Sequence, residues 1–461
     1  MDEGRPGALP RRPRKEECMT RGIGWRRAPA ALAVVALLVA ACGTGASPSP
    51  ATQAPPDGTT GPGESMAPSD DFSGEEVTFV GSWGGSEQDS FLAMVKPWED
   101  RTGAKVKYTG SRGLGAYLTT AVASGTLPDL AGLPGPGEMA QFSEAGALKP
   151  LESVLDMEDY RANTVGALVD LGSVNGQVTG VWMKLSVKGF IWYNTANYSG
   201  DRPANWDGVM AVDPSPADSL FCVALESGAD SGWPGTDWVE DILIRQAGPD
   251  VYDSWVAGQT KWTDPAIKQA FETFGDVLDV SFGGTAYVNS TNFGAGGNEL
   301  FTDPPGCLFH HQASFMSDFF KSQGGAQDGD FDFFVMPEIN SQYAGALTGG
   351  GDLVGLFSDK PAAQDLLRYL VSAEAQQIWA DRGGFVSANT QVTTYPTAVE
   401  QKSADAIHDA TVFRFDGGDL MPGTMKAAFF SAMVQFAENQ GNLDQILADL
   451  DAVQAEAYAA Q

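Results

Sequence analysis

Hydrophobic and polar residues alternate with two different periods from residue 76 onward. Residues 76–81 (EVTFVG) and 105–110 (KVKYTG) are short runs of the kind found in strands. The apolar residues between them recur at i, i+3, i+4 and i+7, as on the buried face of a helix: Phe91, Met94, Val95 and Trp98. This alternation of strand-like and helix-like segments predicts an α/β fold with mainly parallel strands.

The same patterns predict elements along the rest of the chain. A third strand is expected to open at 127–130, and further strands to lie at 179–183, 189–193, 331–336 and 347–357. Further helices are expected at 113–124, 137–146, 236–247, 265–280, 360–372, 373–381, 423–438 and from 442 to the end. Thr236 is expected to cap one helix, and Asp264, which precedes a proline, another. Residues 184–188 are expected to form a short crossing segment between two strands.

The N-terminal region carries a different pattern. Residues 31–42 form an apolar run that stops at Cys42, behind two alanines and downstream of Arg21, Arg26 and Arg27. The run is too short to span a bilayer, and its flanks are typical of a signal peptide. A cysteine at the cleavage point predicts a bacterial lipoprotein signal, so we expect Cys42 to carry lipid. Residues 1–41 are then a precursor segment, in which Met19 is an alternative translation start.

A segment poor in large apolar side chains follows the expected lipid anchor. Residues 42–75 consist mainly of Gly, Ser, Thr, Pro and Ala, so they cannot bury enough surface to fold. We expect a flexible tether here, with the folded part beginning near Glu75. The remaining length is sufficient for two lobes with separate cores.

Charge and cysteine content narrow the compartment and the partners. The chain has a formal net charge of −31, which disfavours nucleic acid and anionic membrane surfaces. Membrane attachment is therefore expected through lipid alone, and we expect a monomer. The cysteines are at 18, 42, 222 and 307; Cys222 and Cys307 are the disulfide candidates in an exported protein, with two buried thiols as the alternative.

Catalytic motifs are scarce. The three histidines, at 310, 311 and 408, have no suggestive serine or cysteine partner, and the sequence has no nucleophile elbow, Walker loop or dinucleotide fingerprint. Adjacent residues on a strand point to opposite faces, so His310 and His311 are not expected to share a metal. We therefore expect no catalytic residue, no metal and no cofactor. A glycosidase remains an alternative, because it needs only two carboxylates and this chain has many.

Tryptophan is the most suggestive residue type. The chain has eleven tryptophans; Trp83 directly follows the first predicted strand, and others gather at 233, 238, 255 and 262. Indole faces stack on the C–H patches of pyranose rings, and neighbouring carboxylates, amides and guanidinium groups bind sugar hydroxyls. About half of these tryptophans are expected to be core anchors instead.

Five motifs have counterparts in one known family. They are residues 125–130 (GTLPDL), 144–151 (EAGALKPL), 189–194 (GFIWYN), 370–379 (LVSAEAQQIW) and 383–387 (GGFVS). From about residue 76 to 455, the chain resembles the extracellular solute-binding proteins of ATP-binding-cassette (ABC) importers, in the carbohydrate-binding group that includes the maltose-binding proteins. It is most similar to the α-glucoside-binding group, through 226–238 (ESGADSGWPGTDW), 306–307 with 311–315 (HQASF), and 419–423 (DLMPG).

The resemblance implies a periplasmic-binding-protein fold: two α/β lobes joined by a hinge, with the ligand in the cleft between them. We expect lobe 1 to comprise 76–185 with 339–390, and lobe 2 to comprise 188–336 with 394–461. Loops at the carboxyl ends of the strands should converge on the ligand. The expected binding residues are Trp83, Ser111, Arg112, Asp129, Trp182, Lys184, Trp233, Asp237, Gln312, Gly350, Asp352 and Arg382.

The chemistry of these side chains suggests their roles. Trp83 and Trp233 would stack on sugar faces, while the charged residues and Gln312 would bind hydroxyls and Gly350 would allow close backbone approach. The expected function is a lipid-anchored extracellular receptor that closes on an α-glucoside of the trehalose, maltose or sucrose type and delivers it to an ABC permease. The alternatives are a surface-attached glycoside hydrolase and a receptor for a non-sugar solute.

Overall fold

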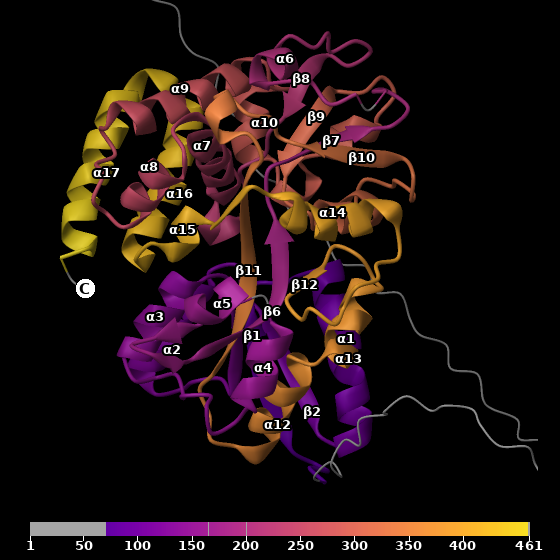
Figure 1. The fold of residues 1–461 in the computed structure, drawn as a ribbon, viewed down its shortest axis with the longest axis vertical. Helices are drawn as coiled ribbons and strands as arrows, with labels where there is room; N and C mark the ends of the chain where they lie inside the picture. Colours follow the sequence, from indigo (N-terminus) through magenta and orange to yellow (C-terminus); the bar gives the residue numbers. More distant parts are fainter. Residues whose placement is uncertain (1–70, 165, 200, 460–461) are drawn as a thin grey trace, which may run out of the picture. The chain divides into compact units, whose positions relative to one another are not determined.

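The described chain has two main β-sheets, each with its own helices, and a third sheet of two short strands (Figure 1). The computed structural model describes residues 71–164, 166–199 and 201–459. The predicted signal peptide, Cys42 and residues 42–70 of the predicted tether lie outside these ranges. No described helix has both the length and the apolar character needed to cross a membrane.

The larger sheet has seven strands, six of them in the order β12-β6-β11-β3-β1-β2, with β13 paired to β11. Their bounds are β1 Glu76–Gly81, β2 Lys105–Gly110, β3 Leu130–Leu133, β6 Gly180–Val187, β11 Ala346–Leu356, β12 Val386–Ser387 and β13 Val412–Phe415. The accompanying elements are α1 Ser86–Thr102, α2 Leu114–Ser124, α3 Pro136–Glu144, α4 Met157–Asn163, α5 Gly166–Leu171, β4 Ser173–Val174, β5 Gln177–Val178, α12 Pro361–Leu370 and α13 Ala373–Ala380. We call this part lobe 1.

The smaller sheet has four strands in the order β10-β7-β9-β8 and forms the centre of lobe 2. Its strands are β7 Phe190–Asn194, β8 Ser219–Cys222, β9 Cys307–Gln312 and β10 Phe331–Val335. Its helices are α6 Trp206–Met210, α7 Trp233–Gln246, α8 Pro249–Val256, α9 Pro265–Asp279, α10 Gly284–Ser290, α11 Met316–Ser322, α15 Gly417–Leu420, α16 Gly423–Glu438 and α17 Leu443–Ala457. Helix α14 Ala398–Asp409 contacts β6 and β12 of lobe 1 and β10 of lobe 2.

Two antiparallel strands, β6 and β11, run side by side where the chain passes between the lobes (Figure 1). Strand β6 leads into β7 of the smaller sheet, and β11 follows β10 of that sheet. The prediction of a separate crossing segment at 184–188 is wrong, because β6 continues to Val187. The side chains of the two lysines in this stretch can be buried because each pairs with a carboxylate: Lys184 with Glu87, and Lys188 with Asp237.

The prediction of mainly parallel strands is also wrong. Strands β1, β2 and β3 are parallel neighbours, but β11 pairs antiparallel with β3 and β6, and β7 pairs antiparallel with β9 and β10. Parallel neighbours need a long crossover, usually through a helix. Here the chain passes between the lobes before it forms several of the strands. Those strands therefore run in the opposite direction to their neighbours in the sheet.

Helix starts followed the predicted signals in one case and not in another. Asp264 caps α9, and its side chain accepts a hydrogen bond from the Ala266 N–H. Helix α7 begins at Trp233, three residues before the predicted cap, and the Thr236 hydroxyl donates back to the Trp233 carbonyl. Pro234 in the first turn has the fixed φ that suits a helix start, so it gives the better signal.

The hydrophobic core is continuous across the lobes in one place. One cluster of buried apolar side chains joins Leu133 and Phe142 of lobe 1 to Phe190 and Trp192 of lobe 2. The two lobes therefore do not have fully separate cores. The fold also begins earlier than predicted, because Phe72 is buried and its N–H donates to the Thr102 carbonyl.

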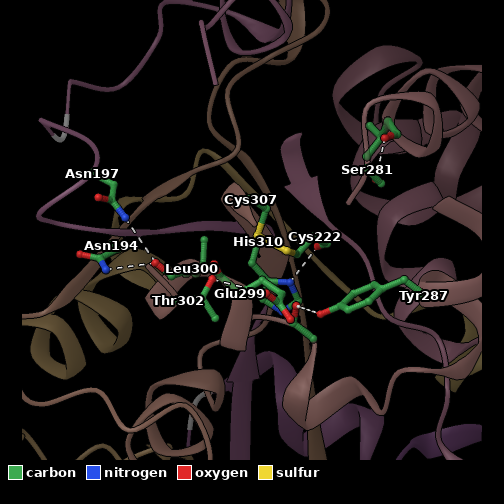
Figure 2. Close-up of a disulfide and its surroundings, with 12 residues drawn as sticks. Asn194, Asn197, Cys222, Ser281, Tyr287, Glu299, Leu300, Thr302, Cys307 and His310 are labelled. Atoms are coloured by element: carbon green, nitrogen blue, oxygen red, sulfur yellow. Dashed lines mark hydrogen bonds between the residues drawn. A yellow bond between two sulfur atoms is a disulfide. The ribbon is translucent and has the colours of Figure 1, made fainter. Parts of the chain in front are cut away.

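A disulfide joins two neighbouring strands of lobe 2 (Figure 2). Cys222, at the end of β8, is bonded to Cys307, at the start of the parallel strand β9, with a Cα–Cα distance of 5.5 Å. The ring of His310 lies beside it, with Nδ1 2.9 Å from the Cys222 carbonyl oxygen. The disulfide holds β8, at the edge of this sheet, against β9, the strand that ends at Gln312.

Candidate functional site

A cavity of about 150 Å³ lies between the lobes and is lined by both. Lobe 1 contributes residues that follow the carboxyl ends of its parallel strands: Trp83 after β1, Arg112 after β2 and Pro134 after β3. Lobe 2 contributes the start of α7 and residues near α11, α15 and α16. This is the edge at which open α/β sheets bind ligands.

Three aromatic rings form an apolar wall on the lobe 2 side of the cavity. The Trp233 ring centroid lies 5.0 Å from that of Phe293 and 6.1 Å from that of Phe315. Trp233 is only partly buried, so some of its indole surface is available to a ligand. Cations of lobe 1 reach the same wall: the Arg112 guanidinium lies 4.7 Å from the Phe293 ring centroid, and the Lys184 ammonium 5.6 Å from that of Phe315.

Trp83 closes the opposite wall but is itself held in the core. It is 2% exposed and stacks against Tyr108 with the ring edge of Trp379 nearby. Its indole N–H donates to Asp352 at 3.3 Å. Burial raises the pKa of Asp352 to about 6, despite the opposing effect of Lys184. Trp83 therefore presents an edge and positions a carboxylate, rather than offering a free face for stacking.

Two cationic side chains, the buried Lys184 and the partly exposed Arg112, share one carboxylate next to Asp352. The Lys184 ammonium is 2.5 Å from Glu87, and the Arg112 guanidinium is 3.8 Å from the same carboxylate. Lys184 is 2% exposed. Glu87 thus fixes the two cations at the cavity wall, where their remaining N–H groups can bind hydroxyl oxygens.

A second ionic cluster lies at the crossing between the lobes. Lys188 pairs with Asp237, at 2.6 Å, and with Asp416. Burial raises the pKa of Asp237 well above its usual value, while the two carboxylates outweigh the effect of burial on Lys188 and raise its pKa. A Cβ at Gly350 would lie 3.3 Å from the Lys188 side chain. Gly350 therefore leaves the space through which Lys188 reaches its partners.

A third cluster connects α16 of lobe 2 with α3 of lobe 1. Lys426 lies 3.0 Å from Glu138 and 3.2 Å from Asp419. Burial disfavours the ammonium, but the two carboxylates raise the pKa of Lys426 on balance. Burial and the neighbouring Asp416 raise the pKa of Asp419 to about 7, and burial raises that of Asp230 to about 6.

The structure brings seven of the twelve predicted binding residues to this cavity and leaves five away from it. Those at the cavity are Trp83, Arg112, Lys184, Trp233, Asp237, Gly350 and Asp352. Those that do not line it are Ser111, Asp129, Trp182, Gln312 and Arg382.

Asp129 is the clearest difference, because it lies at the other edge of the sheet. It precedes β3, accepts hydrogen bonds from the N–H and hydroxyl of Thr78, and pairs with Lys360 at 2.9 Å. Burial works against the ionised form, but these partners lower the pKa of Asp129. The carboxylate thus joins β1 to β3 and is already fully engaged.

The other four have local partners. The Trp182 indole N–H donates to the Leu168 carbonyl, and the Gln312 side-chain oxygen accepts from the Ala313 N–H. Arg382 donates to the Ser90 hydroxyl of α1 at 2.9 Å. Ser111 donates its backbone N–H to the Gly81 carbonyl.

Several cavity residues were not singled out from the sequence: Glu87, Glu138, Ser227, Asp230, Phe293, Phe315, Asp416, Asp419, Lys426 and Phe430. Four of these were within reach, because Ser227, Asp230, Phe315 and Asp419 belong to segments that carry the resemblance to the α-glucoside-binding group. Glu87 and Lys426 sit on ordinary amphipathic helices. Nothing in their local pattern separates them from solvent-facing charges.

The chemistry of the cavity suits the binding of a solute. His310 and His311 are buried elsewhere: His311 lies 2.8 Å from Asp241, and burial lowers the pKa of His310 to about 4. In the described ranges, no group of three or more His, Cys, Asp or Glu side chains is placed to hold a metal. Aromatic faces and fixed charges around a small cavity recognise a solute by shape and hydrogen bonding.

Comparison with known sequences decides the family. The family described as bacterial extracellular solute-binding protein matches residues 84–377. The chain belongs to this family. It is therefore a receptor that binds a solute rather than an enzyme, as expected from the sequence, and the alternative of a glycoside hydrolase is wrong.

Two curated relatives span most of this solute-binding protein. The osmoprotective compounds-binding protein GgtB of Synechocystis is 35% identical over 374 residues, which cover 78% of this chain and 88% of the relative. The alpha-glucosides-binding periplasmic protein AglE of Rhizobium meliloti is 32% identical, covering 81% of this chain and 86% of the relative.

Solved structures agree on the fold. The bacterial solute receptor AcbH, described as having an exclusive preference for β-D-galactopyranose, is 19% identical with a TM-score of 0.72, over 83% of this chain and 98% of that one. The solute-binding protein thus has the predicted two-lobe periplasmic-binding-protein fold.

Proposed function

We propose that this solute-binding protein is the receptor of an ABC importer and binds an α-glucoside of the trehalose, maltose or sucrose type. The observation that carries the proposal is the cavity between the lobes, where the aromatic wall of Trp233, Phe293 and Phe315 faces the charged pairs of lobe 1. A pyranose offers apolar C–H faces to the first and hydroxyls to the second. The name of AglE supports the same ligand class.

The ligand acts by favouring the closed arrangement of the lobes. Because the cavity wall comes from both lobes, a sugar makes its full set of contacts only when they are together. Its higher affinity for that arrangement shifts the population toward it. The closed receptor then docks on a permease, and no covalent bond changes.

Calorimetric titration of the purified protein with maltose, trehalose and sucrose tests the proposal. We expect binding of one sugar per chain, a melting temperature that rises with sugar concentration, and recovery of the intact sugar. Arg112→Ala should weaken binding, whereas Arg382→Ala, at an arginine that does not line the cavity, should leave it unchanged. Absence of binding to all three sugars would overturn the proposal.

A second candidate is a receptor for a cationic, non-sugar solute. The cavity wall holds seven carboxylates and four cationic side chains, and aromatic rings near carboxylates also attract organic cations. The same titration with a polyamine separates the two candidates. Tight binding of the polyamine together with no measurable binding of the glucosides would favour a receptor for a cationic solute.

We also propose that a lipid on Cys42 anchors the receptor to the membrane and that the residues after it act as a flexible tether. The sequence pattern around Cys42 supports this, as does the extracellular location of the family. Such a tether keeps the receptor near the permease and raises its effective concentration there.

A further inference from the structure

A second cavity, of about 640 Å³, lies directly beside the first. It is bounded by α2 and α3 of lobe 1 and by α16 of lobe 2. We call the first cavity the inner cavity and the second the outer cavity. Five residues line both, and therefore form the partition between them: Gly115, Glu138, Asp230, Lys426 and Phe430.

The partition is held by an ion pair between the lobes. Glu138 of α3 and Lys426 of α16 are 3.0 Å apart, with side chains 11% and 9% exposed. One Glu138 oxygen, Oε2, has no hydrogen-bond partner although it is buried. Removing one partner of such a pair would leave the other charge buried without compensation, so the two side chains are kept together.

The position of the Glu138 carboxylate depends on a glycine. A Cβ at Gly115 would lie 2.8 Å from Glu138 Oε1, so a larger residue there would push the carboxylate away from Lys426. The partition is thus built from a backbone position of α2 as well as from the two charged side chains.

The outer cavity has the chemistry of a further sugar site. Its wall includes Thr119, Gln141, Thr424, Ser431 and Gln435, which are neutral groups that both donate and accept hydrogen bonds. A saccharide that extended from the inner cavity would meet these groups only by passing the position of the ion pair.

We infer that the Glu138–Lys426 pair limits the length of the ligand, so that the receptor selects a short glucoside and excludes one that is a residue longer. This inference rests on the proposed function, since it assumes that the inner cavity binds a glucoside. It assigns Glu138 and Lys426 as specificity-determining residues and the outer cavity as the space that they withhold.

The test compares two ligands on the full chain: the disaccharide that binds in the titration above, and the trisaccharide with one more α-linked glucose. The wild-type protein should bind the trisaccharide at least about tenfold more weakly. In the double variant Glu138→Ala/Lys426→Ala, which removes both charges together, the ratio of the two dissociation constants should fall by about tenfold or more.

Two further variants make the result specific to the partition. Removing the exposed Lys268–Asp444 pair of lobe 2 as Lys268→Ala/Asp444→Ala should leave the ratio unchanged. Adding Ala427→Trp, which fills the outer cavity from α16, to the Glu138/Lys426 double variant should restore the discrimination.

The outcomes separate the two proposals. If no glucoside binds to the wild-type protein, the proposed function falls. If the wild-type protein binds both sugars equally well, or if the double variant folds and keeps the wild-type ratio, the sugar receptor stands and the role of the ion pair is overturned. If the double variant does not fold, Gly115→Ala takes its place, because the new Cβ displaces the Glu138 carboxylate; an unchanged ratio in that variant also overturns the role of the ion pair.

Discussion

Trp233 contributes to the cavity by staying partly exposed at the start of α7. Its ring makes a T-shaped contact with Phe293 and is only partly buried, so part of its surface remains available in the cavity. Trp83 has the same side chain and lines the same cavity, but its faces are covered by other rings. Two tryptophans that the sequence assigns to one role therefore differ in what they can offer a ligand.

Trp233→Ala should weaken sugar binding by about tenfold or more, equivalent to about 1.4 kcal/mol. The lost contribution is a flat apolar surface, and the remaining phenylalanines keep the wall in place. Titration calorimetry measures the effect. Tyr117→Ala, at an exposed aromatic residue that lines neither cavity, is the matched control; unchanged affinity in Trp233→Ala would contradict the stacking role.

Asp352→Asn should change stability in a pH-dependent way. Because burial raises the folded-state pKa of Asp352 to about 6, above its usual value of about 4, its ionised form costs stability above pH 6. That cost is relieved as the pH falls from about 6 to 4, where the folded protein binds the proton and the unfolded chain does not. The neighbouring charges are Glu87, Lys184 and Arg112.

Urea unfolding of both proteins at several pH values between 4 and 7.5 measures this effect. The stability of Asp352→Asn relative to wild type should increase with pH and level off above pH 6, by on the order of 3 kcal/mol at most. A difference that is the same at every pH would show that the carboxylate is solvated in the folded protein.

At the scale of elements, the contact between α3 and the segment before α16 depends on close backbone approach. A Cβ at Gly137 would lie 2.3 Å from the Met421 carbonyl oxygen, and one at Gly135 2.5 Å from Asp419. These glycines belong to lobe 1, and the atoms they face belong to lobe 2. A side chain at either position would separate the lobes.

Gly137→Ala should therefore weaken ligand binding while leaving each lobe folded. Alanine favours the helical conformation of α3 itself, so the loss comes from the contact between lobes. We expect the variant to remain more extended than wild type when sugar is added, as measured by small-angle scattering. Gly84→Ala, where a Cβ meets nothing within 4 Å, should behave like wild type; if both variants close equally, this contact does not limit closure.

The sequence predicts well those elements whose apolar residues recur with a single period, either that of a strand or that of a helix. Strands β1 and β2 have the predicted bounds, and α9, α16 and α17 follow their apolar spacing. Strand β6 continues past the predicted end at 183, because a distant carboxylate on α1 pairs with the charge of Lys184. Such pairings join residues far apart in the sequence, so no local window contains them.

The sequence predicts the part of the site that lies at the carboxyl ends of the parallel strands of lobe 1. The loops after β1 and β2 reach the cavity through Trp83 and Arg112. Asp129 does not, because it precedes its strand rather than follows it. Other cavity residues come from helices of both lobes, such as Glu87 of α1, Glu138 of α3 and Lys426 of α16. Their positions depend on how the two lobes meet, which a sequence pattern does not specify.

At the scale of the whole molecule, the proposed anchor has a direct test. Cys42→Ala should release the receptor from the membrane fraction of its host, because a single lipidated residue supplies the attachment. The released protein should bind sugar with wild-type affinity but no longer support uptake, which fractionation and a transport assay measure together. Retention in the membrane fraction would contradict the role of Cys42.

The long strand β11 has a consequence for how this molecule loses its structure. All eleven of its residues are buried, and it pairs with strands β3, β6 and β13. Because β11 also contacts α7 of lobe 2, where the Thr348 hydroxyl donates to Asp241, melting of the larger sheet removes contacts that support the other lobe. Thermal denaturation of the two halves is thereby coupled, and a damaged half exposes the whole receptor to extracellular proteases at once.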